Sequence, residues 1–413
     1  MKHHFWSGTA TLRGNDLNIT LNCSVYQTSE AEGNLIIECR DYSDGLKLFV
    51  QPIGLKIDIP GVSDPLDVCF RSNTLSSDGH SSLILQTQRT PCWFSRSKPI
   101  RIGRFGVINF AHYWMGHPKN LNFDLSAIGW KAQFCAVIDD PLDINRGDEY
   151  KITHRVEFSR EDGSNFSDEE AQDFLWKLSI FLSFCRGQWI NYCLMTGFDD
   201  SGEKVLEQWG TGRVSIWRQP NGWLDEHSGQ CICELYSEFS IKVEDASWLE
   251  TIANVVYWFT RADTSNVGSD GACILLQAAL ERLAWQIIVR ERNAISPKEF
   301  QDLTAADQLR LMLNILSIPT TIPETLARLK SLGLSRGLDG PSVFTYIRNR
   351  LTHPPKISAS TEKLPYYEAC VLAQWYVELA ILAACGYTGK YGNRTVIPRW
   401  VGQVEAVPWA CAG

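Results

Sequence analysis

The chain has 413 residues, of which 44% are hydrophobic and 21% are charged, and its formal net charge is −8. This length suits two or three domains with large cores, and the composition is that of an ordinary soluble globular protein. No apolar run is long enough to cross a membrane, and residues 1–8 contain no apolar core of a secretion signal. We therefore expect a cytoplasmic protein with no membrane partner.

Thirteen cysteines are scattered from Cys23 to Cys411 without paired spacing. Their odd number argues against a complete disulfide framework, and the single close pair, Cys231 and Cys233, has no second pair or nearby histidines to complete a zinc site. Most of them are typical of buried thiols in a reducing compartment. We expect no metal and no cofactor.

The acidic surplus belongs to the N-terminal part of the chain. Residues 1–240 hold 22 Lys and Arg against 31 Asp and Glu, whereas residues 241–413 hold 17 against 16. A protein that coats nucleic acid normally carries a broad basic face. Any nucleic acid should therefore be held locally, in a small basic cleft.

Residues 1–160 alternate between apolar and polar side chains over short runs separated by turn residues. This period of two predicts an antiparallel sandwich or barrel, a fold that often serves in sensing or recognition. The predicted strands are Leu17–Val25, Leu35–Cys39, Leu46–Val50, Leu55–Ile59, Val68–Phe70, Leu83–Leu85, Ile100–Ile108 and Phe134–Ile138.

Residues 161–240 are predicted to form a mixed α/β connecting module. Ser167 is followed by three acidic residues and then by apolar residues at helical spacing up to Gly187, which predicts one amphipathic helix. Strand-like alternation returns over 189–198 and 205–217.

Residues 241–390 are predicted to form an all-helical bundle, so the expected fold class is α+β with several domains. The last of its helices is apolar over most of its circumference and must lie at the centre of the bundle or of a dimer. Residues 391–413 form a tail whose Trp400 and Trp409 are expected to pack onto the body. The predicted helices are Ala246–Thr260, Gly271–Glu291, Thr304–Leu316, Pro323–Leu334, Ser342–His353 and Pro365–Gly386.

Three groups that can handle a phosphate lie at the end of the helix Ser342–His353. Asn349 and His353 are four residues apart, so they share one helix face, and Arg348 is long enough to reach back to them. Among the eight histidines, His353 alone has an arginine five residues before it. Pro354 and Pro355 end the helix and leave the imidazole of His353 beside a loop.

Arg348, Asn349 and His353 resemble the motif of HEPN domains, which is an Arg, a polar residue, three further residues and a His near the end of a helix. On this motif, the protein resembles the bacterial anti-phage, ApeA-like HEPN endoribonucleases. The resemblance implies that Arg348, Asn349 and His353 are catalytic and need no metal. It also suggests Glu281 and Arg350 as supporting residues. RNA, such as tRNA or mRNA, would be cut by its own 2′-hydroxyl, leaving a 2′,3′-cyclic phosphate.

The resemblance further implies a homodimer, because HEPN nucleases usually bring two motifs together across one cleft. The helix Pro365–Gly386 would be a dimer face. By analogy with abortive-infection systems, residues 1–240 would sense a phage-derived trigger and restrain the nuclease.

A non-catalytic protein is the alternative. Arg and His in the last turn of a helix also complement its dipole and bond its free carbonyl groups. In that case the helical bundle would serve dimerisation or partner binding, and the β domain would bind a ligand.

Overall fold

The computed structural model describes residues 2–14, 17–28, 35–40, 54–62, 65–75, 81–88, 92–117, 120–137, 151–218, 222–262, 267–353 and 363–411. They form two compact units, each assembled from separate stretches of the chain. Unit 1 comprises Met1–Phe110, Gly129–Trp176 and Ile190–Trp217, and unit 2 comprises Ala111–Ile128, Lys177–Trp189 and Arg218–Gly413. The predicted strand Leu46–Val50 and the two prolines after His353 lie outside the described residues.

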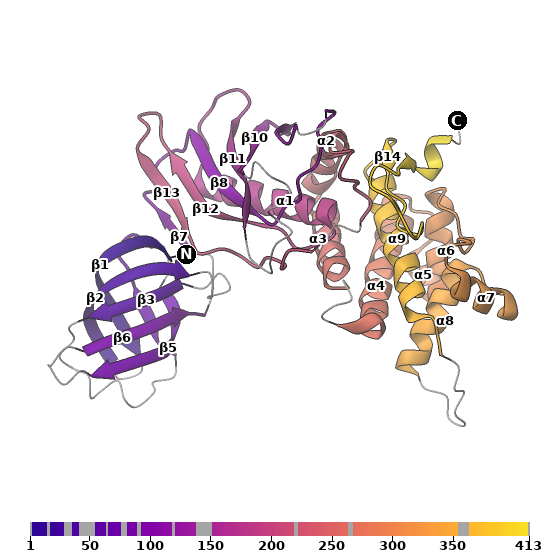
Figure 1. Ribbon diagram of the computed structural model, residues 1–413, viewed down its shortest axis with the longest axis horizontal. Coiled ribbons are helices and arrows are strands. Elements are labelled where there is room, and N and C mark those ends of the chain that lie inside the picture. The colour runs from indigo at the N-terminus through magenta and orange to yellow at the C-terminus, as the bar shows by residue number, and fades with distance from the viewer. Residues whose placement is uncertain are drawn as a thin grey trace. The chain divides into compact units, whose positions relative to one another are not determined.

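The first part of unit 1 is a closed barrel with the strand order β1-β2-β3-β6-β5-β4 (Figure 1). Leu21, Cys23 and Val25 of β2 are buried while Asn22 between them is exposed, as an alternating strand with one face on a core requires. The strands are β1 (Lys2–Gly14), β2 (Leu17–Thr28), β3 (Leu35–Arg40), β4 (Lys56–Asp58), β5 (Leu66–Leu75) and β6 (Ser81–Thr87).

A second sheet has the strand order β7-β13-β12-β8-β11-β10-β9. The ring of Trp130 stacks on Phe174 at 4.7 Å, and Phe158 stacks on Phe174 at 5.0 Å, which joins two strands to the following helix through an aromatic core. The strands are β7 (Cys92–Ser95), β8 (Ile102–Ile108), β9 (Phe123–Ala127), β10 (Trp130–Ala136), β11 (Ile152–Arg160), β12 (Asn191–Phe198) and β13 (Lys204–Trp209).

Helix α1 (Asp168–Arg186) confirms the amphipathic helix predicted after Ser167. Glu170 N–H donates to Ser167 Oγ at 3.2 Å, and Ser167 N–H donates to Glu170 Oε2 at 2.8 Å, so the two residues form a reciprocal cap. The strand predicted up to Trp217 is too long. Strand β13 ends at Trp209 because Gly210 turns the chain with a φ of 81°.

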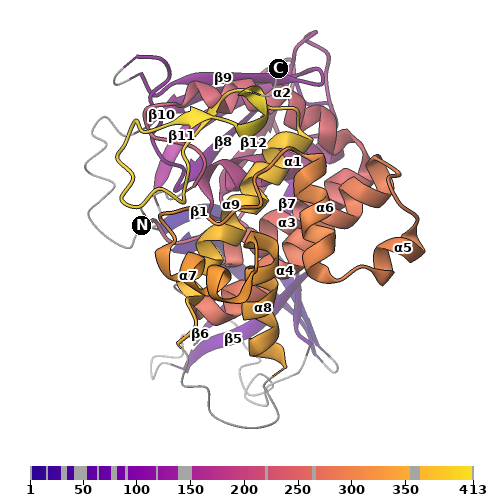
Figure 2. The ribbon, with the colours of Figure 1, turned by 90° about the vertical axis from the view of Figure 1, so that its right-hand side faces the viewer.

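Unit 2 is mainly helical, and α9 lies at its centre. Figure 2 shows α9 among α4, α7 and α8, with α5 at the outer edge of the bundle. Nearly every α9 side chain from Ala369 to Leu382 is buried. The helices are α2 (Gln230–Glu244), α3 (Ala246–Arg261), α4 (Gly268–Trp285), the π-helical η3 (Gln286–Glu291), α5 (Pro297–Asp302), α6 (Ala305–Ile315), α7 (Ala327–Arg336), α8 (Gly340–Thr352) and α9 (Tyr366–Ala384).

From the sequence, this apolar helix could lie either at the centre of the bundle or at the centre of a dimer, and the burial of α9 favours the first. It is the core of its own unit, so its apolar surface is already covered and does not offer a broad face to a second copy. By length and composition, α9 and the continuous helix Gly268–Glu291 could cross a membrane, but 78% and 67% of their most apolar windows are buried inside the unit. Core helices of soluble proteins have the same properties.

The tail adds β14 (Lys390–Tyr391), β15 (Glu405–Ala406) and the short 3-10 helix η4 (Pro408–Cys411). Trp409 Nε1–H donates to the carbonyl of Tyr387 at 2.7 Å, as expected for a residue that packs onto the body. Trp400 does not pack in this way, because 76% of it is exposed. The fold class is nevertheless confirmed: a β-rich N-terminal region is followed by a helical C-terminal region.

Candidate active site

Helix α8 carries the predicted motif, and Asp339 fixes where this helix begins. The Asp339 carboxylate accepts the N–H of Ser342 at 3.0 Å and binds Arg310 in bidentate fashion, at 2.7 Å from Nε and 3.0 Å from Nη2. Burial raises the pKa of Asp339, but the bonds from Arg310 and Ser342 outweigh it and hold this pKa below its ordinary value. The carboxylate therefore ties α8 to α6.

Gly340 allows the start of α8 to approach α9 closely. A Cβ atom at this position would lie 2.2 Å from the Tyr376 hydroxyl and 2.8 Å from the Thr320 carbonyl oxygen. The next turns bury Val343, Phe344 and Ile347, so one face of α8 is held in the core. Near the C-terminal end, Asn349 lies on the opposite, exposed face, and half-buried Arg348 lies beside the buried face.

At that end the structure brings Arg348 and Asn349 into contact. Arg348 Nη1–H donates to Asn349 Oδ1 at 3.1 Å. His353 is the C-terminal cap of α8, its backbone N–H donates to the carbonyl of Asn349 at 2.8 Å, and it is exposed. The guanidinium, the amide and the imidazole therefore occupy one helix end that reaches water, and none of the three residues is buried.

This helix end is positively charged. The sequence of α8 contains no acidic residue, and half-buried Arg350 follows Asn349. In addition, Arg336 of α7 lies over the ring of Tyr346, with Cζ 4.7 Å from the ring centroid. Tyr346 precedes Asn349 by three residues and thus lies next to it on the helix surface. Sequence reasoning missed Arg336, because nothing near it marks a contact with a residue ten positions later.

Arg348 is only half exposed, and its Nε atom is buried without a hydrogen-bond partner among the described residues. A buried donor without an acceptor costs about 1–3 kcal/mol. The guanidinium would therefore gain from an anion that draws it toward water.

Glu281, which the family resemblance suggests as a supporting acid, lies on α4 and is half-buried. It accepts a hydrogen bond from Gln277 Nε2 at 2.8 Å. Its neighbour Arg282 pairs with Glu250 at 2.8 Å. No hydrogen bond or ion pair within the described chain joins Glu281 to the motif on α8. Nor do the described residues contain a group of three or more His, Cys, Asp or Glu side chains that could hold a metal ion.

The part of the chain that carries the motif is similar in sequence to known proteins. Residues 245–406 match the model of the YopA C-terminal domain, and residues 126–220 match that of the YopA central domain. The chain is 28% identical over 261 residues to the SPbeta prophage-derived uncharacterized protein YopA of Bacillus subtilis (strain 168), a match that covers 63% of this chain. The chain spans 58% of the length of that relative. No solved structure matches. The helical region that carries Arg348, Asn349 and His353 is thus similar to the YopA C-terminal domain, a name that states no activity.

Proposed function

We propose that the protein is a metal-independent endoribonuclease of the HEPN type, acting through Arg348, Asn349 and His353. The observation that supports this best is the helix end itself: Arg348 contacts Asn349 at 3.1 Å, and exposed His353 caps the same helix, which has no acidic residue. Such an end attracts a phosphate and offers it both a planar guanidinium and a group that transfers protons near neutral pH.

In the proposed reaction, His353 takes the proton of a ribose 2′-hydroxyl, and the 2′-oxygen forms a bond to phosphorus. The bond from phosphorus to the 5′-oxygen breaks, and that oxygen receives a proton as it leaves. Arg348 stabilises the charge on the non-bridging oxygens, held in place by Asn349. The products are a 2′,3′-cyclic phosphate and a 5′-hydroxyl, and the nucleophile belongs to the substrate.

The departing oxygen needs an acid on the other side of the phosphorus, and one motif supplies a single histidine. We therefore propose a homodimer in which two motifs share one cleft. Because α9 is buried inside its own unit, the dimer must use another surface than the one expected from the sequence. The exposed end of α8 must lie near that surface for the two motifs to meet.

We further propose a cytoplasmic anti-phage role, in which the N-terminal β-rich region detects a phage-derived trigger and controls the nuclease. A relative derived from a prophage supports a setting in which phages and hosts compete. The division of the chain into a β-rich and a helical part supports separate sensing and cutting regions.

RNA cleavage by matched variants tests the proposal. Wild type should cut mixed tRNA and mRNA, and His353→Ala and Arg348→Ala should each lower the rate at least about a hundredfold, the usual size of an acid–base or charge contribution. The controls are His117→Ala and Arg290→Ala, which change exposed residues elsewhere. Equal cleavage by all five proteins would contradict the assignment, and sedimentation equilibrium should show a dimer.

A further inference from the structure

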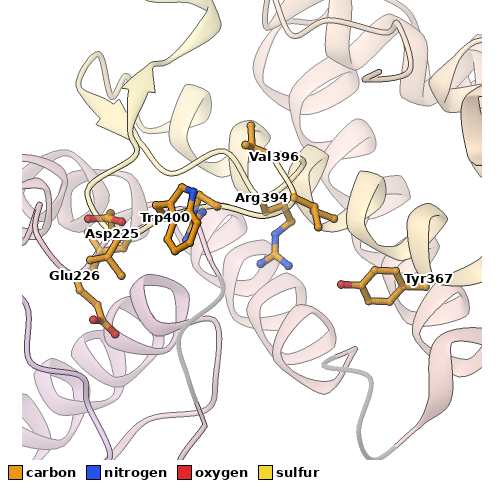
Figure 3. Close-up of a pocket in the computed structure, with 10 residues that line it drawn as sticks. Asp225, Glu226, Tyr367, Arg394, Val396 and Trp400 are labelled. Carbon is orange, nitrogen blue, oxygen red and sulfur yellow. The ribbon is translucent and has the colours of Figure 1, made fainter. Parts of the chain in front are cut away.

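Unit 2 contains a cavity of about 410 Å³ beside α9, and none of its lining residues belongs to the motif (Figure 3). This volume lies within the range of small-ligand pockets. Its lining comes from the segment before α2, the first turn of α9 and the tail. The lining residues are Leu224, Asp225, Glu226, Tyr367, Arg394, Val396, Ile397, Arg399, Trp400 and Val401.

Arg394 is held rigidly at this cavity. Its Nε and Nη2 donate to the two oxygens of Glu378 at 2.9 and 2.6 Å, and Nη1 donates to Gln374 at 2.6 Å. Glu378 is fully buried and also accepts the N–H of Trp223 at 3.1 Å. A guanidinium has five N–H donors, and three are used here, so two remain for a ligand. The ion pair with Glu378 therefore balances the charge of Arg394 but leaves these two N–H donors for a ligand.

Arg399 is a second guanidinium in the lining. Its Nη1 donates to the carbonyl of Gly222 at 2.9 Å. Within the described chain, neither Nε nor Nη2 has an acceptor, and no carboxylate lies within ion-pair distance. Burial lowers the pKa of Arg399. A Cβ at Gly392 would lie 2.6 Å from Arg399 Nη1, so a side chain there would displace this guanidinium.

Two acidic residues, Asp225 and Glu226, share the lining with the two arginines. Asp225 accepts backbone N–H groups: that of His227 at 2.9 Å, and that of Gly402 at 3.0 Å from each oxygen. It thereby fixes the loop that carries Trp400. The carboxylate of Glu226 points away from Arg394 (Figure 3). Because Asp225, Glu226 and Glu378 balance the two guanidinium groups, the cavity offers a phosphodiester unused N–H donors of Arg394 and Arg399 rather than a net positive charge.

The rim of the cavity is aromatic and exposed. Trp400 is 76% exposed and Tyr367 is 55% exposed, an unusual state for large rings. Figure 3 shows the guanidinium of Arg394 between these two rings. Exposed rings beside cationic groups are how proteins hold single-stranded nucleic acid, because bases stack on the rings while the cations bind the backbone.

We propose that this cavity binds one dinucleotide step of single-stranded RNA, at a position distinct from the cutting motif. The phosphodiester lies against Arg399 and the two unused donors of Arg394. One base stacks on Trp400, and the neighbouring nucleoside lies toward Tyr367. This inference rests on the proposed function only in taking RNA as the substrate, and it assigns the cavity to holding RNA rather than to cutting it.

Binding by the full-length His353→Ala protein tests the proposal without cleavage. Fluorescence anisotropy is measured with a labelled ten-nucleotide single-stranded RNA, and Trp400→Ala is added to this background. Loss of one stacked base should weaken binding by about 5- to 150-fold. Trp176→Ala, which removes a 44% exposed tryptophan elsewhere, should leave the affinity unchanged. Because Trp400 is exposed, its removal should not unfold the chain, which circular dichroism checks.

Two further measurements define the ligand. Arg399→Gln should also weaken binding and reduce its dependence on salt, and a dinucleoside monophosphate should compete better than a free nucleoside. Equal affinity of the Trp400→Ala and parent proteins would overturn the inference, as would equal binding of duplex RNA. If RNA binding depends on Trp400 but the wild-type protein does not cut RNA, the cavity binds RNA and the proposed nuclease activity is refuted. If the wild-type protein cuts RNA but binds it equally well without Trp400, the nuclease activity stands and the RNA site at the cavity is refuted.

Discussion

Asn349 illustrates how one residue of the motif can act through another. Its side-chain oxygen accepts from Arg348 Nη1 at 3.1 Å, and its backbone carbonyl accepts the N–H of His353. The residue therefore restrains the guanidinium and the start of the loop that bears the imidazole. A role of this kind depends on the acceptor oxygen rather than on the amide nitrogen.

Two replacements of Asn349 test whether its acceptor oxygen positions Arg348. Asn349→Ala removes the acceptor and should slow single-turnover RNA cleavage about tenfold or more, since a hydrogen bond to a charged group contributes about 1.5–3 kcal/mol. Asn349→Asp keeps an acceptor and should retain most of the rate. If the Ala variant cuts as fast as wild type, or the Asp variant is as slow as Ala, Asn349 does not position Arg348.

At the residue scale, the sequence predicted the cluster on α8 but not its surroundings. The spacing of Asn349 and His353 follows from helix geometry, so their place at one helix end could be read directly. The pairing of Glu281 with Gln277 could be read in the same way, because Gln277 is the polar residue among the four positions three or four residues away. Whether Glu281 reaches the motif on α8 could not be read, because that depends on how the helices pack. Arg336 and the exposure of Trp400 likewise depend on contacts between distant segments.

At the scale of single elements, the position of α8 depends on the link between Asp339 and Arg310. This link provides both the helix cap and a bridge to α6. Because the pKa of Asp339 is lowered in the folded state, its contribution to stability is complete above the ordinary pKa of about 3.9. It is lost as the pH falls through the lower, folded-state value.

Asp339→Ala should therefore lower the free energy of unfolding near neutral pH by about 1–3 kcal/mol, through loss of the cap and of an acceptor for Arg310. Urea unfolding measures this, with Asp302→Ala at an exposed helix end as the control. The difference from wild type should be constant between pH 7 and 5 and shrink below about pH 4. An unchanged midpoint at pH 7 would show that the link does not stabilise α8.

Helix α1 combines a start signal with several turns of apolar spacing and was predicted, whereas two helices with only one of these signals were missed. Helix α1 has its cap at Ser167 and several turns of apolar spacing. Helix α2 was missed: it follows Gly229, which gives no side-chain cap, although six buried apolar residues recur at helical spacing. Helix α5 has a capping box at Ser296 and Glu299, but its six residues are too few to show a period.

At the scale of the whole molecule, the two units are not consecutive stretches of sequence. Each contains segments from three places in the chain, and the second sheet joins strands that are more than a hundred residues apart. Local patterns predict strands and helices but carry no information on which distant segments meet. The β-rich to helical order could thus be predicted, whereas the composition of the units could not.

The most direct test of the proposed activity asks which group attacks phosphorus. Wild type is given a single-stranded RNA with EDTA present, and the same RNA with a 2′-deoxyribose at the cleaved position. We predict cleavage of the first to a 2′,3′-cyclic phosphate and none of the second at that position. Cleavage at the deoxyribose, or cleavage that EDTA abolishes, would contradict a metal-independent attack by the substrate's own hydroxyl.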